Sequence, residues 1–137
     1  MSKRSVLLVI QAAFLALPAL AALAERDLVP SLENAPNVCA DRPAEPDWMQ
    51  SIALREAYKR VLVQDIYRAQ NLERILEEGN CDCGMRFPSW DAAEAEFFER
   101  FANAERWEML QASDDFNRRA SAARPEAMAI CEAAGNW

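Results

Sequence analysis

The stretch "DWMQSIALREAYKRVLVQDIYRAQNLERILEE", residues 47–78, decides the fold that we expect for this chain. It contains no Gly or Pro, and its apolar side chains recur at steps of three, four or six, which places them on one face of a helix. Asp47 and Gln50 suit a capping box, and Gly79 suits a C-terminal cap. The pattern predicts one unbroken helix over 47–78. Its apolar stripe consists of Trp48, Ile52, Tyr58, Leu62, Ile66, Ala69, Leu72 and Leu76.

A second stretch without Gly or Pro, residues 90–123, predicts a helix of similar length. Arg124 precedes Pro125, which ends this helix and opens a short last one that stops at Gly135. No run alternates like a strand, so we expect an all-α fold: a long antiparallel helical hairpin plus a short C-terminal helix. A three-helix bundle is the alternative if the chain breaks at Ser113, a competent N-cap. The second stripe consists of Phe98, Phe101, Met109, Ala112, Phe116, Ala120 and Ala123.

The first 24 residues have the layout of a secretory signal peptide. Lys3 and Arg4 form a basic head, an apolar run follows, and Ala22-Leu23-Ala24 supplies the small residues that a signal peptidase reads. We therefore expect cleavage after Ala24, export to the periplasm in a Gram-negative cell, and no stable membrane insertion afterwards. An uncleaved anchor is the competing interpretation, because residues 5–24 are barely long enough to span a bilayer.

The part that remains after cleavage is long enough for one domain. Residues 25–46 contain four prolines and no helical period, so we expect an extended arm, followed by a single helical domain over 47–137. Residues 25–137 carry 13 basic and 22 acidic side chains. Such an acidic surface repels nucleic acid and anionic lipid, so neither is expected as a partner.

The four cysteines are expected to form disulfides, because exported thiols are usually oxidised. A helix over 47–78 would be about 48 Å long. Cys39 lies eight residues before that helix begins, and eight extended residues reach at most about 27 Å. Cys39 would then be unable to reach Cys81 or Cys83 at the far end. The returning second helix would instead bring Cys131 beside it, which predicts a Cys39–Cys131 bond. A break at Ser113 would change this pairing.

The motif "NCDCG", residues 80–84, leaves three interpretations of Cys81 and Cys83. The favoured one is a structural staple, which includes a strained bond across Asp82. Inter-chain bonding or a redox pair is second, although for redox use the motif lacks C-x-x-C spacing and Asp82 would oppose thiolate formation. A metal site is last, because the chain has no histidine and two sulfurs do not complete a closed site.

Catalytic chemistry is not expected. Without histidine, Ser-His and Cys-His pairs are impossible, and three glycines leave no phosphate-binding loop. Glu94 and Glu96 show no sign of flanking a cleft, so a glycosidase-type pair is not supported. We therefore expect no catalytic residue, no cofactor and no metal. Trp90 and Trp107 are expected in the core, and Trp137, beyond the last cap, is a candidate partner contact.

The block "NLERILEEGNCDCGMRFPSWDAAEAEFFERF", residues 71–101, and the ending "CEAAGNW", residues 131–137, resemble small exported proteins encoded with alphaproteobacterial conjugation and type IV secretion gene clusters. The resemblance implies an accessory role in an envelope-spanning machine. It assigns no catalytic or binding residue.

These observations together predict a non-catalytic exported helical protein that acts by protein–protein contact in the cell envelope. The alternative is a small periplasmic thiol-redox or metal-handling protein that uses Cys81 and Cys83. A third interpretation is an envelope-stress or inhibitor protein that blocks a periplasmic enzyme.

Overall fold

The computed structural model describes residues 39–137, and every regular element in this part of the chain is helical. The all-α prediction is therefore confirmed for the described residues. No helix within 39–137 combines the length and the apolarity needed to cross a membrane. The expected signal peptide, 1–24, and the first part of the expected arm, 25–38, lie outside the described residues. The elements are α1 (Asp47–Gln50), the 3-10 turn η2 (Leu54–Glu56), α2 (Ala57–Glu78), α3 (Cys83–Arg86), α4 (Asp91–Arg100) and α5 (Arg106–Ala133).

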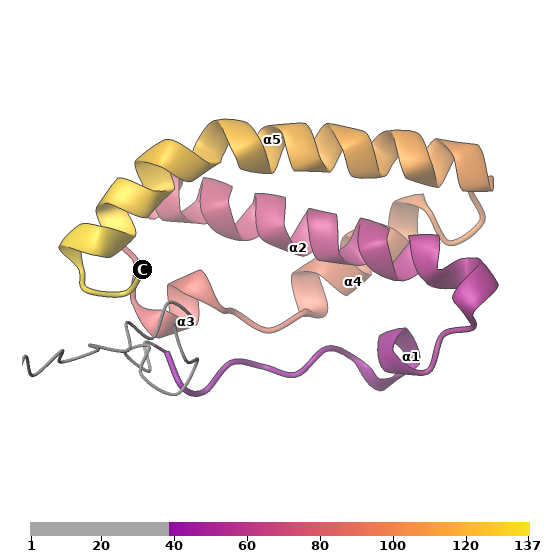
Figure 1. The fold of residues 1–137 in the computed structure, drawn as a ribbon, viewed down its shortest axis with the longest axis horizontal. Coiled ribbons are helices and arrows are strands. Elements are labelled where there is room, and N and C mark those ends of the chain that lie inside the picture. Colours follow the sequence, from indigo (N-terminus) through magenta and orange to yellow (C-terminus); the bar gives the residue numbers. More distant parts are fainter. Residues whose placement is uncertain (1–38) are drawn as a thin grey trace, which may run out of the picture. The chain divides into compact units, whose positions relative to one another are not determined.

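The first predicted helix is broken near its start, so the single helix over 47–78 is wrong. Ser51 ends α1, its hydroxyl donating to the Asp47 carbonyl at 2.9 Å, and Ala53 is extended with ψ 142°. Figure 1 shows the chain running from the α3 end of the domain to the start of α2 and then turning back. The turn lets Trp48 stack on Phe97 of α4, with ring centroids 5.6 Å apart. The break therefore makes a tertiary contact possible, and the periodicity of apolar residues in the sequence does not predict such a contact.

The second predicted helix is also broken, but not at Ser113. α4 ends at Arg100, and α5 begins after Glu105, whose backbone N–H donates to the Glu108 carboxylate at 2.7 Å in a capping box. α5 then continues through Pro125, where we expected a helix boundary. A proline removes one backbone hydrogen bond, and α5 bends in its last third, as Figure 1 shows.

The two long helices, α2 and α5, run in the same direction, so the predicted antiparallel hairpin is wrong. Hydrogen bonds join Arg68 to Asn117 and Arg119 to Glu73, separations of 49 and 46 residues. The sequence separation between contacting residues stays nearly constant along the two helices, as it does only when neighbouring helices are parallel. α4 supplies the return between them, which Figure 1 shows as a shorter helix beneath α2. The described architecture is therefore closer to the three-helix alternative.

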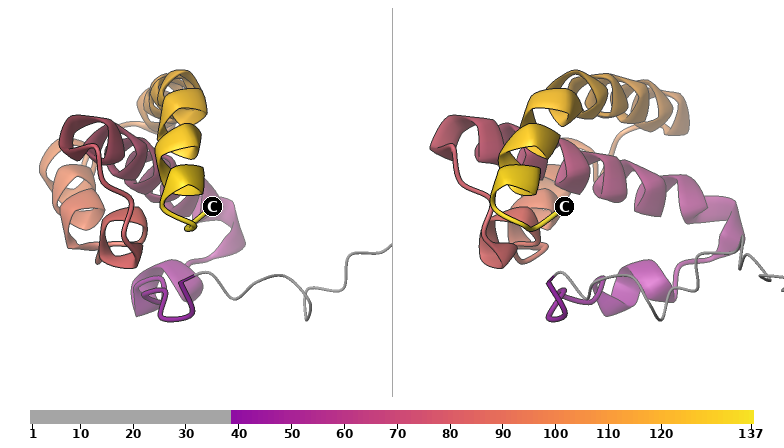
Figure 2. Two further views of the ribbon diagram at one scale, coloured as in Figure 1. Left: turned by 90° about the vertical axis from the view of Figure 1, so that its left-hand side faces the viewer. Right: turned by 60° about the vertical axis from the view of Figure 1, so that its left-hand side comes forward.

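The core lies where α2 packs between α5 and α4, an arrangement that the end-on view of Figure 2 shows. The predicted stripes supply much of it, although Phe98 is 53% exposed. One polar contact crosses it: the Ser113 hydroxyl donates to the buried Asp65 carboxylate, whose other oxygen lies 3.4 Å from an Arg68 nitrogen. Buried stripe residues are Leu62, Ile66, Ala69, Leu72, Phe101, Met109, Phe116, Ala120 and Ala123.

The predicted Cys39–Cys131 bond is wrong. Cys39 bonds Cys83 and Cys81 bonds Cys131, with Cα atoms 5.2 and 4.9 Å apart, both within the usual range for disulfides. The error follows from the two helix breaks. The early turn carries Cys39 back to the α3 end, and the break before α5 sends Cys131 to the same end. All four cysteines therefore lie at one end of the domain, and all four are bonded, which is consistent with an oxidising compartment.

Candidate functional site

The "NCDCG" motif forms the turn between α2 and α3. Gly79 has the left-handed φ of 61° that closes α2, and its N–H donates to the Ile75 carbonyl at 2.9 Å. Asp82 caps α3 by accepting from the Met85 N–H at 2.7 Å, and Asn80 donates to the same carboxylate at 3.0 Å. The Met85 hydrogen bond first, and then the one from Asn80, lower the pKa of Asp82. Asp82 is thus a helix cap.

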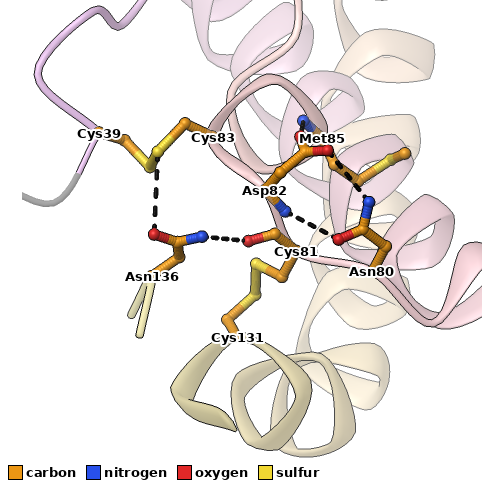
Figure 3. The surroundings of a disulfide bond; sticks show 8 residues. All are labelled: Cys39, Asn80, Cys81, Asp82, Cys83, Met85, Cys131 and Asn136. Atoms are coloured by element: carbon orange, nitrogen blue, oxygen red, sulfur yellow. Dashed lines mark hydrogen bonds between the residues drawn. A yellow bond between two sulfur atoms is a disulfide. The ribbon is translucent and has the colours of Figure 1, made fainter. Parts of the chain in front are cut away.

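The two disulfides fix this turn from opposite sides, as Figure 3 shows. Cys81 and Cys131 are fully buried and join the C-terminal ends of α2 and α5. Cys83, which is exposed, joins α3 to the arm through Cys39. Because each sulfur has a partner 44 or 50 residues away, the motif contains no bond across Asp82.

Asn136 holds the C-terminal segment against the disulfides (Figure 3). Its side-chain amide donates to the Cys81 carbonyl at 2.6 Å, and its backbone N–H donates to the Cys131 carbonyl at 2.8 Å. Its Oδ1 lies 3.9 Å from the Cys83 sulfur, a contact without a proton because the sulfur is disulfide-bonded. These contacts place Trp137 beside α3.

Beside the disulfides lies a pocket of about 470 Å³, formed by α2, α3, α5 and the C-terminal segment. This volume is in the range of small-molecule sites. One wall is aromatic: Tyr67 and Trp90 stack with centroids 3.8 Å apart. The Tyr67 hydroxyl donates to the Pro88 carbonyl at 2.8 Å, and the Trp90 indole donates to the Pro43 carbonyl at 3.3 Å. Burial raises the pKa of Tyr67, so its hydroxyl stays a donor at neutral pH.

Elsewhere in the lining, arginine side chains pack on aromatic rings. The Arg86 guanidinium carbon lies 4.6 Å from the Trp137 ring centroid and 5.0 Å from that of Phe87. The Arg124 guanidinium carbon lies 5.2 Å from the same Trp137 centroid, and that of Arg42 lies 4.2 Å from the Phe87 centroid. These distances are those of cation–π contacts. We call the lined cavity the arginine–aromatic pocket.

The arginine charges in this pocket are only partly compensated. Arg68 lines it too and has Asp65 as an ion-pair partner. Among residues 39–137, no carboxylate lies within 4.0 Å of the Arg86, Arg124 or Arg42 guanidinium. Burial first, and then the charge of Arg42, lower the pKa of Arg86, although it stays protonated at neutral pH. The pocket therefore concentrates positive charge in an acidic chain.

A second feature is a group of exposed apolar side chains at the other end of the domain. Trp107 on the first turn of α5 is 65% exposed, so its predicted place in the core is wrong. Leu54 on η2 is 93% exposed. Val61 on α2 and Leu110 on α5 are about half exposed. They are separated by the same 49 residues as the hydrogen-bonded pair Arg68 and Asn117, so they lie at the same height along the two parallel helices. Tyr58, packed 5.1 Å from the Arg106 guanidinium, joins the two helix starts. We call Leu54, Val61, Trp107 and Leu110 the apolar end.

Glu94 and Glu96, the carboxylates considered as a catalytic pair, each bind other side chains. Glu94 accepts from the Trp48 indole at 2.7 Å, and Glu96 accepts from the Gln70 amide at 2.7 Å and pairs with Arg100. Within the described part of the chain, no three His, Cys, Asp or Glu side chains gather in a way that would hold a metal ion.

No protein-family model, no curated protein and no solved structure matches this chain. The sequence did not predict the arginine–aromatic pocket, because its residues come from four separate segments that no local spacing connects. The one available signal was the excess of arginine over lysine in the sequence.

Proposed function

We propose that this protein is a non-catalytic, exported binding module that acts by protein–protein contact in the cell envelope. The observation that supports it is the apolar end, where Trp107 is 65% and Leu54 is 93% exposed. Surface apolar residues scattered singly are ordinary, but here Val61 and Leu110 lie level on neighbouring helices. Trp is also enriched among residues that dominate protein interfaces.

The disulfides support a role as a rigid module. They hold the opposite end of the domain, so that the first turns of α2 and α5 present the apolar end on a preorganised frame. Preorganisation lowers the entropy lost on binding. An accessory role in a conjugation or type IV secretion assembly agrees with such a module, and the partner would then be an exported or membrane-anchored component of that machine.

The alternative role in thiol-redox or metal chemistry has no specific support in the geometry. It requires Cys81 and Cys83 as a pair, and each of these sulfurs bonds another cysteine. Thiol titration of the native exported protein tests this alternative, because two accessible thiols would favour it over the binding role.

Site-specific photo-cross-linking tests the proposed contact. A photoreactive residue replaces Trp107 or Leu110 in the full chain, expressed in the cell that encodes it, and Arg118, which is exposed on α5, is the matched control position. We expect a discrete adduct with an envelope protein from positions 107 and 110 and none from 118. Equal adducts at all three positions, or adducts only with a second copy of the chain, would contradict the proposal.

A further inference from the structure

We propose that the arginine–aromatic pocket binds an oxyanion, a carboxylate or phosphate group, carried on a flat apolar body. This inference goes beyond the proposed function and does not depend on it. The pocket lies beside the disulfides, whereas the apolar end is formed by η2 and the starts of α2 and α5.

The charge of the pocket argues for an anion. The whole chain has a formal net charge of −7, yet Arg68, Arg86 and Arg124 line one cavity. Arg42 lies close to Arg86, because both guanidinium carbons pack on the Phe87 ring, 4.2 and 5.0 Å from its centroid. Like charges at this spacing repel, and only Arg68 has a carboxylate partner among residues 39–137. An oxyanion in the cavity would relieve the repulsion and accept charge-assisted hydrogen bonds from guanidinium groups.

The walls argue for a flat body attached to the anion. Tyr67, Trp90, Phe87 and Trp137 all line the cavity, and Tyr67 and Trp90 already form a stack inclined by only 14°. Aromatic faces favour stacked or edge-on contact with another planar group. A volume of about 470 Å³ exceeds what a bare anion fills and suits a group of one or two amino-acid residues.

The architecture argues for a preorganised site. Asn136 fixes the segment that carries Trp137, and Cys39–Cys83 fixes α3, which carries Arg86. Asn71, which is 6% exposed, adds a nearly buried amide to the lining. Arginine side chains that already pack on rings lose less conformational entropy when they bind, so the cost of ordering them is reduced.

The tryptophan indole N–H signals of the oxidised, ¹⁵N-labelled full chain provide the test. Trp90 and Trp137 line the pocket, and Trp107 is the internal control. The probes are N-acetyl-phenylalanine, its neutral amide, phenyl phosphate and inorganic phosphate. We expect saturable shifts of the Trp90 and Trp137 signals with the two aromatic anions and none with the neutral amide. The anion that binds more tightly identifies the source, a carboxylate or a phosphate ester.

The matched variants are Arg124→Gln and Arg86→Gln against Arg118→Gln, which lies on α5 and pairs with Asp115 outside the pocket. Arg124 is exposed, so its replacement is expected to leave the fold intact. Loss of one charged hydrogen bond weakens binding by about tenfold or more, whereas Arg118→Gln leaves it unchanged. Equal shifts with the neutral amide, no saturable shift with either aromatic anion, or wild-type affinity in both pocket variants would overturn the proposal. Equal affinity for inorganic phosphate and phenyl phosphate would refute the role of the aromatic walls.

Discussion

Removing the Cys81–Cys131 bond is the perturbation for which the structure yields the clearest magnitude. The bond closes a loop of 50 residues, and chain entropy assigns such a loop about 4 kcal/mol of stability. Cys39–Cys83 closes a loop of 44 residues, worth about the same. The two loops share only residues 81–83, so on the chain-entropy model each bond constrains a different part of the unfolded chain. Small domains have about 5–15 kcal/mol in total, so losing both bonds should leave the domain largely unfolded near body temperature.

The assay is urea unfolding followed by helical circular dichroism, extrapolated linearly to water. We expect Cys81→Ala/Cys131→Ala to lose about 4 kcal/mol of unfolding free energy, and slightly more because buried sulfur atoms are removed. Cys39→Ala/Cys83→Ala is the matched control, and it should lose at most the same amount because the freed arm regains entropy in the folded state. A loss under about 1 kcal/mol for the buried pair would refute the reasoning.

The exposures of the two bonds predict an order of reduction. Cys83 is exposed, whereas Cys81 and Cys131 have no exposed surface. A mild reductant should therefore open Cys39–Cys83 first, because exchange requires access to a sulfur. Cleavage on the amino side of Asp82 separates Cys81 from Cys83, so peptide mapping of partly reduced protein reports both the pairing and the order. A Cys39–Cys131 peptide would contradict the structure.

Three further predictions concern stability. Asp65→Ala should cost about 1–3 kcal/mol in urea unfolding because it leaves the buried Ser113 hydroxyl unpaired; a double-mutant cycle with Ser113→Ala showing no coupling would contradict this. Gly79→Ala should cost about 1 kcal/mol from left-handed backbone strain alone, since no atom lies within 4 Å of the added Cβ; an unchanged urea midpoint would refute it. Asp82 has a folded pKa below its usual 3.8, so its contribution is present above that value and lost as the pH falls through the lower folded pKa. Asp82→Asn should flatten the acid limb of stability against pH, and an unaltered limb would count against the cap.

The sequence by itself determined the class of the fold and much of its core. Uninterrupted helical spacing excluded strands, and Gly79 marked the end of α2 correctly. Leu62, Ile66 and Phe116 are buried as their spacing predicts. These features are local, because the face of a helix and the conformation of a glycine depend on neighbours within a few residues.

Only the tertiary structure decided where the helices break, how they run and which cysteines meet. Apolar spacing indicates which side chains face the core, but it does not reveal a break when the side chains on both sides of the break pack on that core, as Trp48 and Leu62 do. Glu105 gave no warning of a helix start, because glutamate is not a usual N-cap. The unforeseen turn before α5 reversed the direction of α5 relative to α2. Together with the turn before α2, it brought Cys39 and Cys131 to the end that holds Cys81 and Cys83. The pairing of the cysteines and the arginine–aromatic pocket both follow from long-range packing. The spacing of residues along the chain does not encode these long-range contacts.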